Sequence, residues 1–183
     1  MEPLFVIVGV AVLVPVIALL VSYNRFVRQR NLVRDSWANV DAELQRRYDL
    51  IPNLVRTVQG YADHERRLFE QVAAARARAL TETGSPARAA EAENELVRGV
   101  RSVLGLAEAY PDLKASHNFL ELQRELAITE DRIQAARRFY NANVRDLNIR
   151  VQAVPSNVVA RWFGFEEADY FEIEEAVREV PSV

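Results

Sequence analysis

The chain has 183 residues, enough for one domain with a hydrophobic core. Hydrophobic residues make up 50% of it, which excludes a chain that is disordered throughout. A formal net charge of −3 argues against a general nucleic-acid binder. The absence of cysteine excludes disulfides and thiolate metal sites, and the small number of glycines favours long helices.

The first predicted element is a membrane-spanning helix over residues 4–21, which carry no charged or polar side chain. At about 1.5 Å per residue this segment covers roughly 27 Å, close to the hydrocarbon thickness of a bilayer. A cleaved signal peptide is disfavoured because Met1-Glu2-Pro3 has no basic residue and no A-x-A-like site follows. The predicted membrane-spanning residues are Leu4, Phe5, Val6, Ile7, Val8, Gly9, Val10, Ala11, Val12, Leu13, Val14, Pro15, Val16, Ile17, Ala18, Leu19, Leu20 and Val21.

The charges on either side of this segment predict its orientation. Only Glu2 precedes it, and a run of basic residues follows, made up of Arg25, Arg28, Arg30 and Arg34. Basic residues stay in the cytoplasm, so we expect the N-terminus outside and the bulk of the chain inside. The same arginines would attract anionic lipid headgroups, each by about 1 kcal/mol. We therefore divide the chain into an anchor (1–24), a cytoplasmic helical bundle (25–154) and a C-terminal tail (155–183).

A helical apolar stripe follows the anchor, with steps of three or four residues: Val33, Trp37, Val40, Leu44, Tyr48, Ile51, Val55 and Val58. Pro52 interrupts it, because proline lacks the backbone N–H that would bond to the carbonyl of Tyr48. Either the helix kinks and continues, or it turns and Pro52 starts a new helix that runs to about Thr81. The turn is slightly preferred, and it would bring the C-terminal tail back towards the membrane. A continuing helix would leave the tail far from the bilayer.

The later elements are also helical. Residues 81–86 form a loop, residues 87–107 a helix, and Tyr110-Pro111-Asp112 a break before a long helix over residues 113–153. This last helix carries a seven-residue repeat of Phe119, Leu126, Ile133, Tyr140, Leu147 and Val154. Such a repeat predicts left-handed bundle packing, within one chain or between chains. The fold class is therefore all-α, an up-and-down antiparallel bundle of three to four long helices on one anchor.

After Pro155 the sequence changes to a short helix and an acidic, aromatic tail. Ser156 and Asn157 are suitable N-caps and Gly164 suits a helix end. We expect the tail to dock on the bundle, on the bilayer or on a neighbouring molecule. Its predicted contact residues are Trp162, Phe163 and Phe165.

Catalytic motifs are weak in this chain. His64-Glu65 begins an H-E-x-x-H pattern, but Leu68 stands where the second histidine should be. A di-iron E-x-x-H pair fails as well, because Tyr61 precedes His64 and Lys114 precedes His117 at that spacing. There is no nucleophile elbow and no phosphate loop. The sequence predicts no enzyme, no metal and no cofactor.

One polar row accompanies the seven-residue repeat. Gln123, Glu130 and Arg137 each follow a core position by four residues, and Tyr140 and Asn141 add hydrogen-bonding groups nearby. Residues seven apart are too far from one another for the usual pairing along a helix, so each needs a partner on another helix. The row is either an ordinary boundary of the bundle, or a polar register lock or intersubunit contact.

Three segments together resemble the LemA family of bacterial membrane proteins: YDLIPNLVRTVQGYADHE, LQRELAITEDRIQAARRFYNANVRDLN, and VPSNVVARWFGF followed by YFE. The resemblance implies a helical up-and-down bundle on one anchor in the bacterial inner membrane, with a short external N-terminus. It implies no activity and supplies no catalytic residues, although a magnetosome-associated branch of the family points to membrane organisation. The matching residues are Asp49, Pro52, Asn53, Leu54, Gly60, Tyr61, Gln123, Glu130, Arg137, Tyr140, Asn141, Pro155, Ala160, Phe163 and Phe165.

Two functions are compatible with these features. The first is a non-catalytic, membrane-anchored scaffold that contacts membrane lipid and self-associates into a homo-oligomer at the cytoplasmic face. The second is a membrane-anchored adaptor or sensor that binds a membrane or cytoplasmic protein through its C-terminal tail. Neither function involves nucleic acid.

Overall fold

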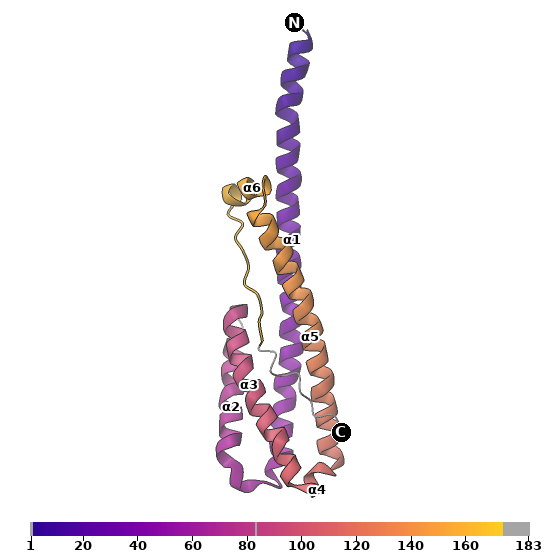
Figure 1. The fold of residues 1–183 in the computed structure, drawn as a ribbon, viewed down its shortest axis with the longest axis vertical. Coiled ribbons are helices and arrows are strands. Elements are labelled where there is room, and N and C mark those ends of the chain that lie inside the picture. The colour runs from indigo at the N-terminus through magenta and orange to yellow at the C-terminus, as the bar shows by residue number, and fades with distance from the viewer. Residues whose placement is uncertain (1, 83, 174–183) are drawn as a thin grey trace. The chain divides into compact units, whose positions relative to one another are not determined.

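The computed structural model describes residues 2–82 and 84–173, which are helical apart from short connections and the C-terminal tail (Figure 1). The predicted all-α class is confirmed. The elements are α1 (Glu2–Gln59), η1 (Asp63–Glu65), α2 (Arg66–Thr81), α3 (Pro86–Leu106), η2 (Ala107–Ala109), α4 (Pro111–Lys114), α5 (His117–Gln152) and α6 (Ser156–Phe163).

The chain divides into two compact units, which cut across the order of the sequence. Unit 1 holds residues 1–37 and 140–168, and unit 2 holds residues 38–139 and 169–183. The long helices α1 and α5 therefore each run through both units.

Helix α1 continues through Pro52 to Gln59, so the preferred prediction of a turn at this proline was wrong. The physical reason lies on another helix. Proline cannot donate to the carbonyl of Tyr48, and Arg76 of α2 donates its Nε–H to that oxygen instead, at 2.7 Å. The carbonyl that Pro52 leaves without its helical partner is thus satisfied from outside the helix.

The first long helix ends at Gln59, just before Gly60, rather than at the proline. The backbone N–H groups of Tyr61 and Ala62 both bond to the carbonyl of Val58, each at 3.0 Å, and this closes the last turn. The second helix then starts at Arg66, later than predicted. The last long helix also starts later than predicted, because the short helix α4 comes before it.

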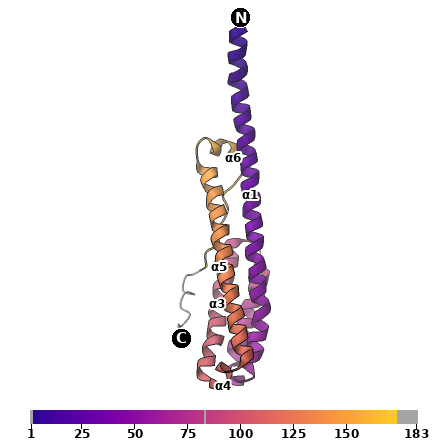
Figure 2. The same cartoon turned by 90° about the vertical axis from the view of Figure 1, so that its right-hand side faces the viewer.

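Unit 2 is a four-helix bundle. The second half of α1, then α2, α3 and the first half of α5, run alternately up and down (Figures 1 and 2). Helices α2 and α3 approach closely at Gly99, where an added Cβ would lie 2.9 Å from a methyl group of Val72. The predicted stripes of both long helices are buried here, at Val40, Leu44, Tyr48, Ile51, Val58, Phe119, Leu126 and Ile133.

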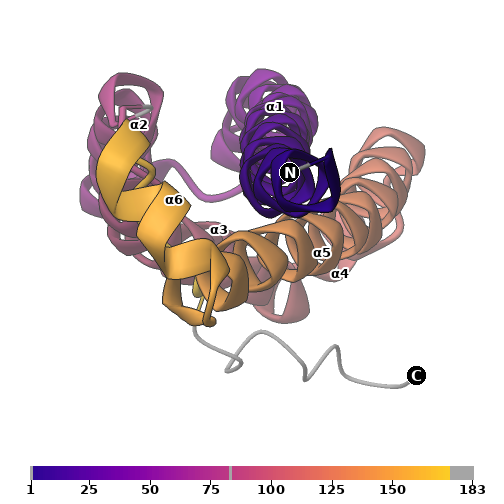
Figure 3. The ribbon, with the colours of Figure 1, turned by 90° about the horizontal axis from the view of Figure 1, so that it is seen from above.

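Unit 1 joins the first half of α1 to the end of α5 and to α6. Its core consists of Phe26, Leu147, Val159, Ala160 and Phe165. Seen from above, α6 lies crosswise to α1 (Figure 3). From Val10 to Val21 most of the large apolar side chains of α1 are left uncovered by the rest of unit 1, with exposures near one half. Helix α1 is long and apolar enough to cross a membrane.

The α5–α6 corner differs from the prediction in two details. Val154, expected to complete the seven-residue repeat, follows the end of α5 and is 82% exposed. Pro155 rather than Ser156 or Asn157 occupies the N-cap of α6, and the Ser156 hydroxyl instead donates to the end of α5, 2.7 Å from the carbonyl of Arg150. Gly164 ends α6 at φ 67°, a left-handed conformation that favours glycine, as predicted.

Candidate functional site

An aromatic cluster lies at the start of the polar part of α1. It consists of Tyr23, Phe26, Phe163 and Phe165. The Phe163 ring meets Tyr23 edge-on at 4.9 Å between centroids, and the Phe165 ring stacks on Phe26 at 4.8 Å. The left-handed turn at Gly164 directs the chain so that the residues on both sides of it contact α1. Tyr23 is only two residues past the apolar segment, so this cluster lies where that segment ends.

Arg30 adds a charged contact to the cluster. Its guanidinium carbon lies 5.3 Å from the centre of the Phe165 ring, within the range of a cation–π interaction. Of the four arginines that predict orientation, Arg30 therefore packs against the tail. All four arginines, Arg30 included, are solvent-exposed.

The position of the cluster corrects one expectation. A continuing α1 was expected to leave the tail far from the bilayer, yet Phe163 and Phe165 contact α1 immediately beyond the apolar segment. The expectation failed because α5 itself runs back along the first half of α1 and carries α6 with it. Trp162, the third predicted tail contact, is 77% exposed and lies outside the cluster.

The tail beyond α6 is fastened to α5 in unit 1. Asn148 makes two hydrogen bonds with the backbone of Ala168: its amide nitrogen donates to the carbonyl at 3.0 Å, and its amide oxygen accepts from the N–H at 2.9 Å. One turn further along α5, Gln152 donates to Glu167 at 3.0 Å. The amide of Asn148 can satisfy both backbone groups because it carries a donor and an acceptor side by side.

Unit 2 holds the next part of the tail. Arg137 of α5 donates to the backbone carbonyl of Ile173 at 3.0 Å, and Phe171 is fully buried. The described part of the tail is therefore docked on the helices. Residues 174–183, the end of the predicted acidic tail, lie outside the described residues.

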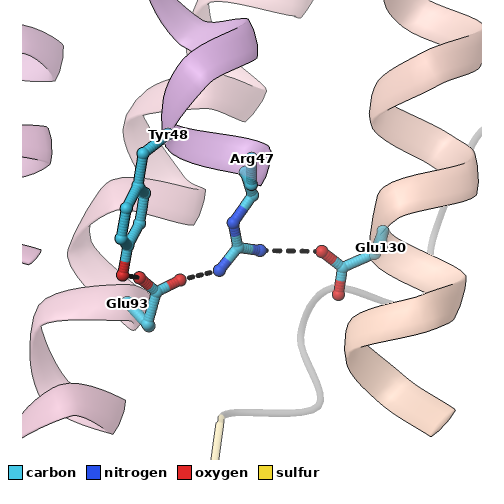
Figure 4. A network of polar contacts seen from close by, with 4 residues as sticks. All are labelled: Arg47, Tyr48, Glu93 and Glu130. Carbon is cyan, nitrogen blue, oxygen red and sulfur yellow. Dashed lines mark hydrogen bonds and ion pairs between the residues drawn. The ribbon is translucent and has the colours of Figure 1, made fainter. Parts of the chain in front are cut away.

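A charge network is buried in the core of unit 2 (Figure 4). Arg47 of α1 is 4% exposed and lies between two carboxylates on different helices. Its Nη1 lies 2.8 Å from Oε2 of Glu130 on α5, and its Nη2 forms an ion pair with Glu93 on α3. The Tyr48 hydroxyl donates to the other oxygen of Glu93, which is itself fully buried. Three helices are thus joined through one guanidinium.

Burial changes the acidity of two groups in this network. Burial raises the pKa of Tyr48 to about 12, and the neighbouring Arg47 charge opposes part of that rise. Burial also lowers the pKa of Arg47 from its ordinary value, while Glu130 and Tyr48 act in the opposite direction. The carboxylates favour the charged form of Arg47, which is what a buried guanidinium requires.

The predicted polar row of α5 does not act as one set. Glu130 contacts Arg47 and Arg137 contacts the tail, so both have partners within the chain. Tyr140 is buried and its ring lies 5.2 Å from Trp37, whereas Gln123 is exposed. Asn141, the last member of the predicted set, is half-buried.

Arg47 and Glu93 are not among the site residues predicted from the sequence. A signal for Glu93 was present, because it lies on the same helical face as Ala89, Leu96 and Val100, all of which are buried. A carboxylate in such a stripe requires a basic partner, but the partner comes from a helix far away in sequence. Arg47 carries the same signal, because it lies three residues after Leu44 and four before Ile51 on the buried face of α1.

The remaining candidate positions carry little chemistry. His64 and His117 are both exposed, and no group of three or more His, Asp or Glu residues suited to a metal occurs among the residues that the structure describes. A shallow, open groove of about 450 Å³ lies between α1 and the start of α5 in unit 2. It is lined by Asn53, Arg56, Thr57, Asn118, Glu121, Leu122 and Glu125, a mixture typical of solvated helix faces.

Known proteins resemble this chain over most of its length. Magnetosome protein MamQ 2 of Paramagnetospirillum magneticum (strain AMB-1) is 26% identical, over 92% of this chain and 71% of the relative. Protein LemA of Metamycoplasma hominis is 24% identical, over 85% of this chain and 71% of the relative. Together with the apolar N-terminal helix, these relatives indicate a membrane-associated protein. The sequence model of the LemA family matches residues 36–183, and the chain therefore belongs to the LemA family.

Proposed function

We propose that this protein is a non-catalytic structural scaffold, anchored in the bacterial inner membrane by residues 4–21, that self-associates at the cytoplasmic face. The observation that carries the proposal is an exposed apolar face on α5. Its members, all in unit 2, are Leu120, Ile128 and Phe139, with exposures of 49%, 43% and 56%. At 100° per residue these three positions fall within an arc of about 100°, so they share one side of the helix.

This outer face of α5 suits a second copy of the chain. Its apolar residues are not used in the seven-residue packing seam, which is already buried within the chain. Asp131 and Arg138 lie in the same arc and are both exposed, so the face carries both signs of charge and two copies can complement each other. Confinement to one membrane raises the effective concentration of neighbouring copies, so even a weak contact supports assembly.

The names of the MamQ relatives are compatible with a role at membranes, since they are called magnetosome proteins. We extend this to the present chain as part of the proposal. The absence of cysteine makes a direct test straightforward, because a single introduced cysteine reports only on its own position.

The test compares two single-cysteine variants in native membranes. Phe139→Cys places a thiol on the outer face of α5, and Arg101→Cys places one at an exposed position of α3. With mild oxidant, the Phe139→Cys chain is expected to form disulfide-linked dimers and the Arg101→Cys chain to stay monomeric. Equal cross-linking of both, or a strictly monomeric full-length protein in nanodiscs by light scattering, would contradict the scaffold.

A second candidate function is an adaptor or sensor that binds a protein through its tail. It is favoured by the exposure of Trp162 and Tyr170, 77% and 38% respectively. The burial of Phe165 and Phe171 leaves those rings unavailable to a partner. The variant Trp162→Ser should abolish recruitment of a partner by the full-length protein and leave self-association intact. If Trp162→Ser instead abolishes self-association, Trp162 belongs to the assembly interface.

A further inference from the structure

We propose that α6 and the α5–α6 corner form a second membrane contact, which lies on the bilayer surface next to the α1 anchor. The contact residues are Val154, Val158 and Trp162, and the ligand is the headgroup and upper acyl layer of the bilayer. This inference rests on the proposed anchoring by residues 4–21. It does not depend on self-association.

The depth of α6 follows from the aromatic cluster. Tyr23 lies two residues past Val21, which is about 3 Å along a helix from the end of the apolar segment. Its ring is 4.9 Å from that of Phe163, the last residue of α6. The polar interface of a bilayer extends for about 5–7 Å beyond the hydrocarbon core. If residues 4–21 span the membrane, α6 lies within this layer.

The face that α6 leaves uncovered is apolar. Val159 and Ala160 are buried in the core of unit 1, whereas Val154, Val158 and Trp162 are 82%, 60% and 77% exposed. Val158 and Trp162 are one helical turn apart and therefore share a face. Tryptophan is enriched at membrane interfaces because one part of its ring is apolar and its N–H needs a polar partner.

Orientation and charge support the same ligand. Helix α6 lies crosswise to α1, so it runs along the bilayer surface when α1 crosses the bilayer (Figure 3). Arg25 and Arg28 on α1, and Arg161 on α6, are exposed around the aromatic cluster, where they can contact lipid phosphates. A short amphipathic helix with this pattern is typical of interfacial binding, with its apolar side about 5–10 Å deep.

The experiment uses the two tryptophans of the full-length chain one at a time. Trp37→Phe leaves Trp162 as the only tryptophan, and Trp162→Phe leaves Trp37. Both proteins are placed in nanodiscs, at one chain per disc, with lipids brominated near the top of the acyl chain. Trp162 emission is expected to fall by about half, since bromine quenches only at close range and Trp162 lies in the interface. Trp37, about 24 Å along α1 from Val21, is expected to lose almost nothing.

A matched pair of variants separates lipid contact from folding. In the Trp37→Phe chain, Val158→Asp should reduce the quenching of Trp162 and Val158→Leu should preserve it, with equal helix content by circular dichroism. Unquenched Trp162 in single-chain discs would overturn the inference, and so would quenching that appears only when a second chain is present. If carbonate washing removes both Val158→Asp and Val158→Leu from the membranes, the proposed anchoring by residues 4–21 is wrong. If the protein stays in the washed membranes and Phe139→Cys still cross-links, but Trp162 is not quenched, only the proposed membrane contact of α6 is refuted.

Discussion

Glu93 and Arg47 are the two charged side chains most completely removed from water in the described residues. Taking a carboxylate and a guanidinium out of water costs several kcal/mol each, and their mutual attraction offsets this only where the geometry is good. Here the guanidinium also reaches Glu130, and Glu93 also accepts from Tyr48. The network therefore contributes mainly to the register of three helices, since each of its members loses its partners if a helix shifts.

Removal of one member of this network should be costly. Glu93→Ala leaves the buried Arg47 charge with Glu130 alone, and we expect the free energy of unfolding to fall by about 3–5 kcal/mol. The measurement is denaturant or thermal unfolding of the full-length protein in detergent. Glu95→Ala, on the exposed side of the same helix, should cost at most about 1 kcal/mol. Similar losses in the two variants would show that the network does not act as a buried unit.

Tyr48 predicts a dependence on alkaline pH. Its folded-state pKa of about 12 lies above the ordinary value of 10.0, because burial disfavours the phenolate. The resulting stability is fully present below about pH 10 and is lost as the pH rises through about 12. Between those pH values the free energy of unfolding should therefore fall with rising pH, and it should fall less in Tyr48→Phe than in the unaltered protein. An identical decline in the two proteins would assign the effect to other groups.

At the scale of elements, the continuity of α1 depends on α2. Proline in the middle of a helix normally costs about 3 kcal/mol or more, partly through the lost hydrogen bond. In this chain the orphaned carbonyl of Tyr48 accepts from Arg76, and the helix carries on for nearly two further turns. The guanidinium thus takes the place of a backbone donor.

A double-mutant cycle tests this relationship. Arg76→Ala should lower the free energy of unfolding by about 1–2 kcal/mol, because it leaves the Tyr48 carbonyl unsatisfied. In a Pro52→Ala background the new N–H bonds to that carbonyl, so the same substitution should cost much less. Arg78→Ala, at an exposed position on the same helix, serves as the control. Strict additivity of Pro52→Ala and Arg76→Ala would contradict the role of Arg76.

Periodicity predicted the elements well because burial repeats with the helix. The seam from Phe119 to Leu147 and the stripe from Val40 to Val58 are buried where expected. The fate of Pro52 could not be predicted in this way, because the compensating donor comes from Arg76 in a different helix. The sequence predicts that Glu130 and Arg137 need partners outside α5. It does not identify those partners, because they lie on segments far away in sequence.

At the scale of the whole molecule, the orientation in the membrane is the most direct prediction. From the arginines that follow residues 4–21, we expect the body of the chain to lie in the cytoplasm. In intact spheroplasts, a membrane-impermeant maleimide should label Glu2→Cys and not Glu70→Cys on α2, and both should react after lysis. Labelling of Glu70→Cys before lysis would reverse the proposed topology.

The contact between Arg76 and the carbonyl of Tyr48 also bears on how the chain is made. Translation delivers Pro52 before Arg76, so the last turns of α1 emerge without the donor that supports them. We expect the nascent chain to be helical from the anchor to about Tyr48 and frayed beyond it until α2 has been synthesised and docked. Pro52 would therefore delay closure of the bundle until α2 has left the ribosome.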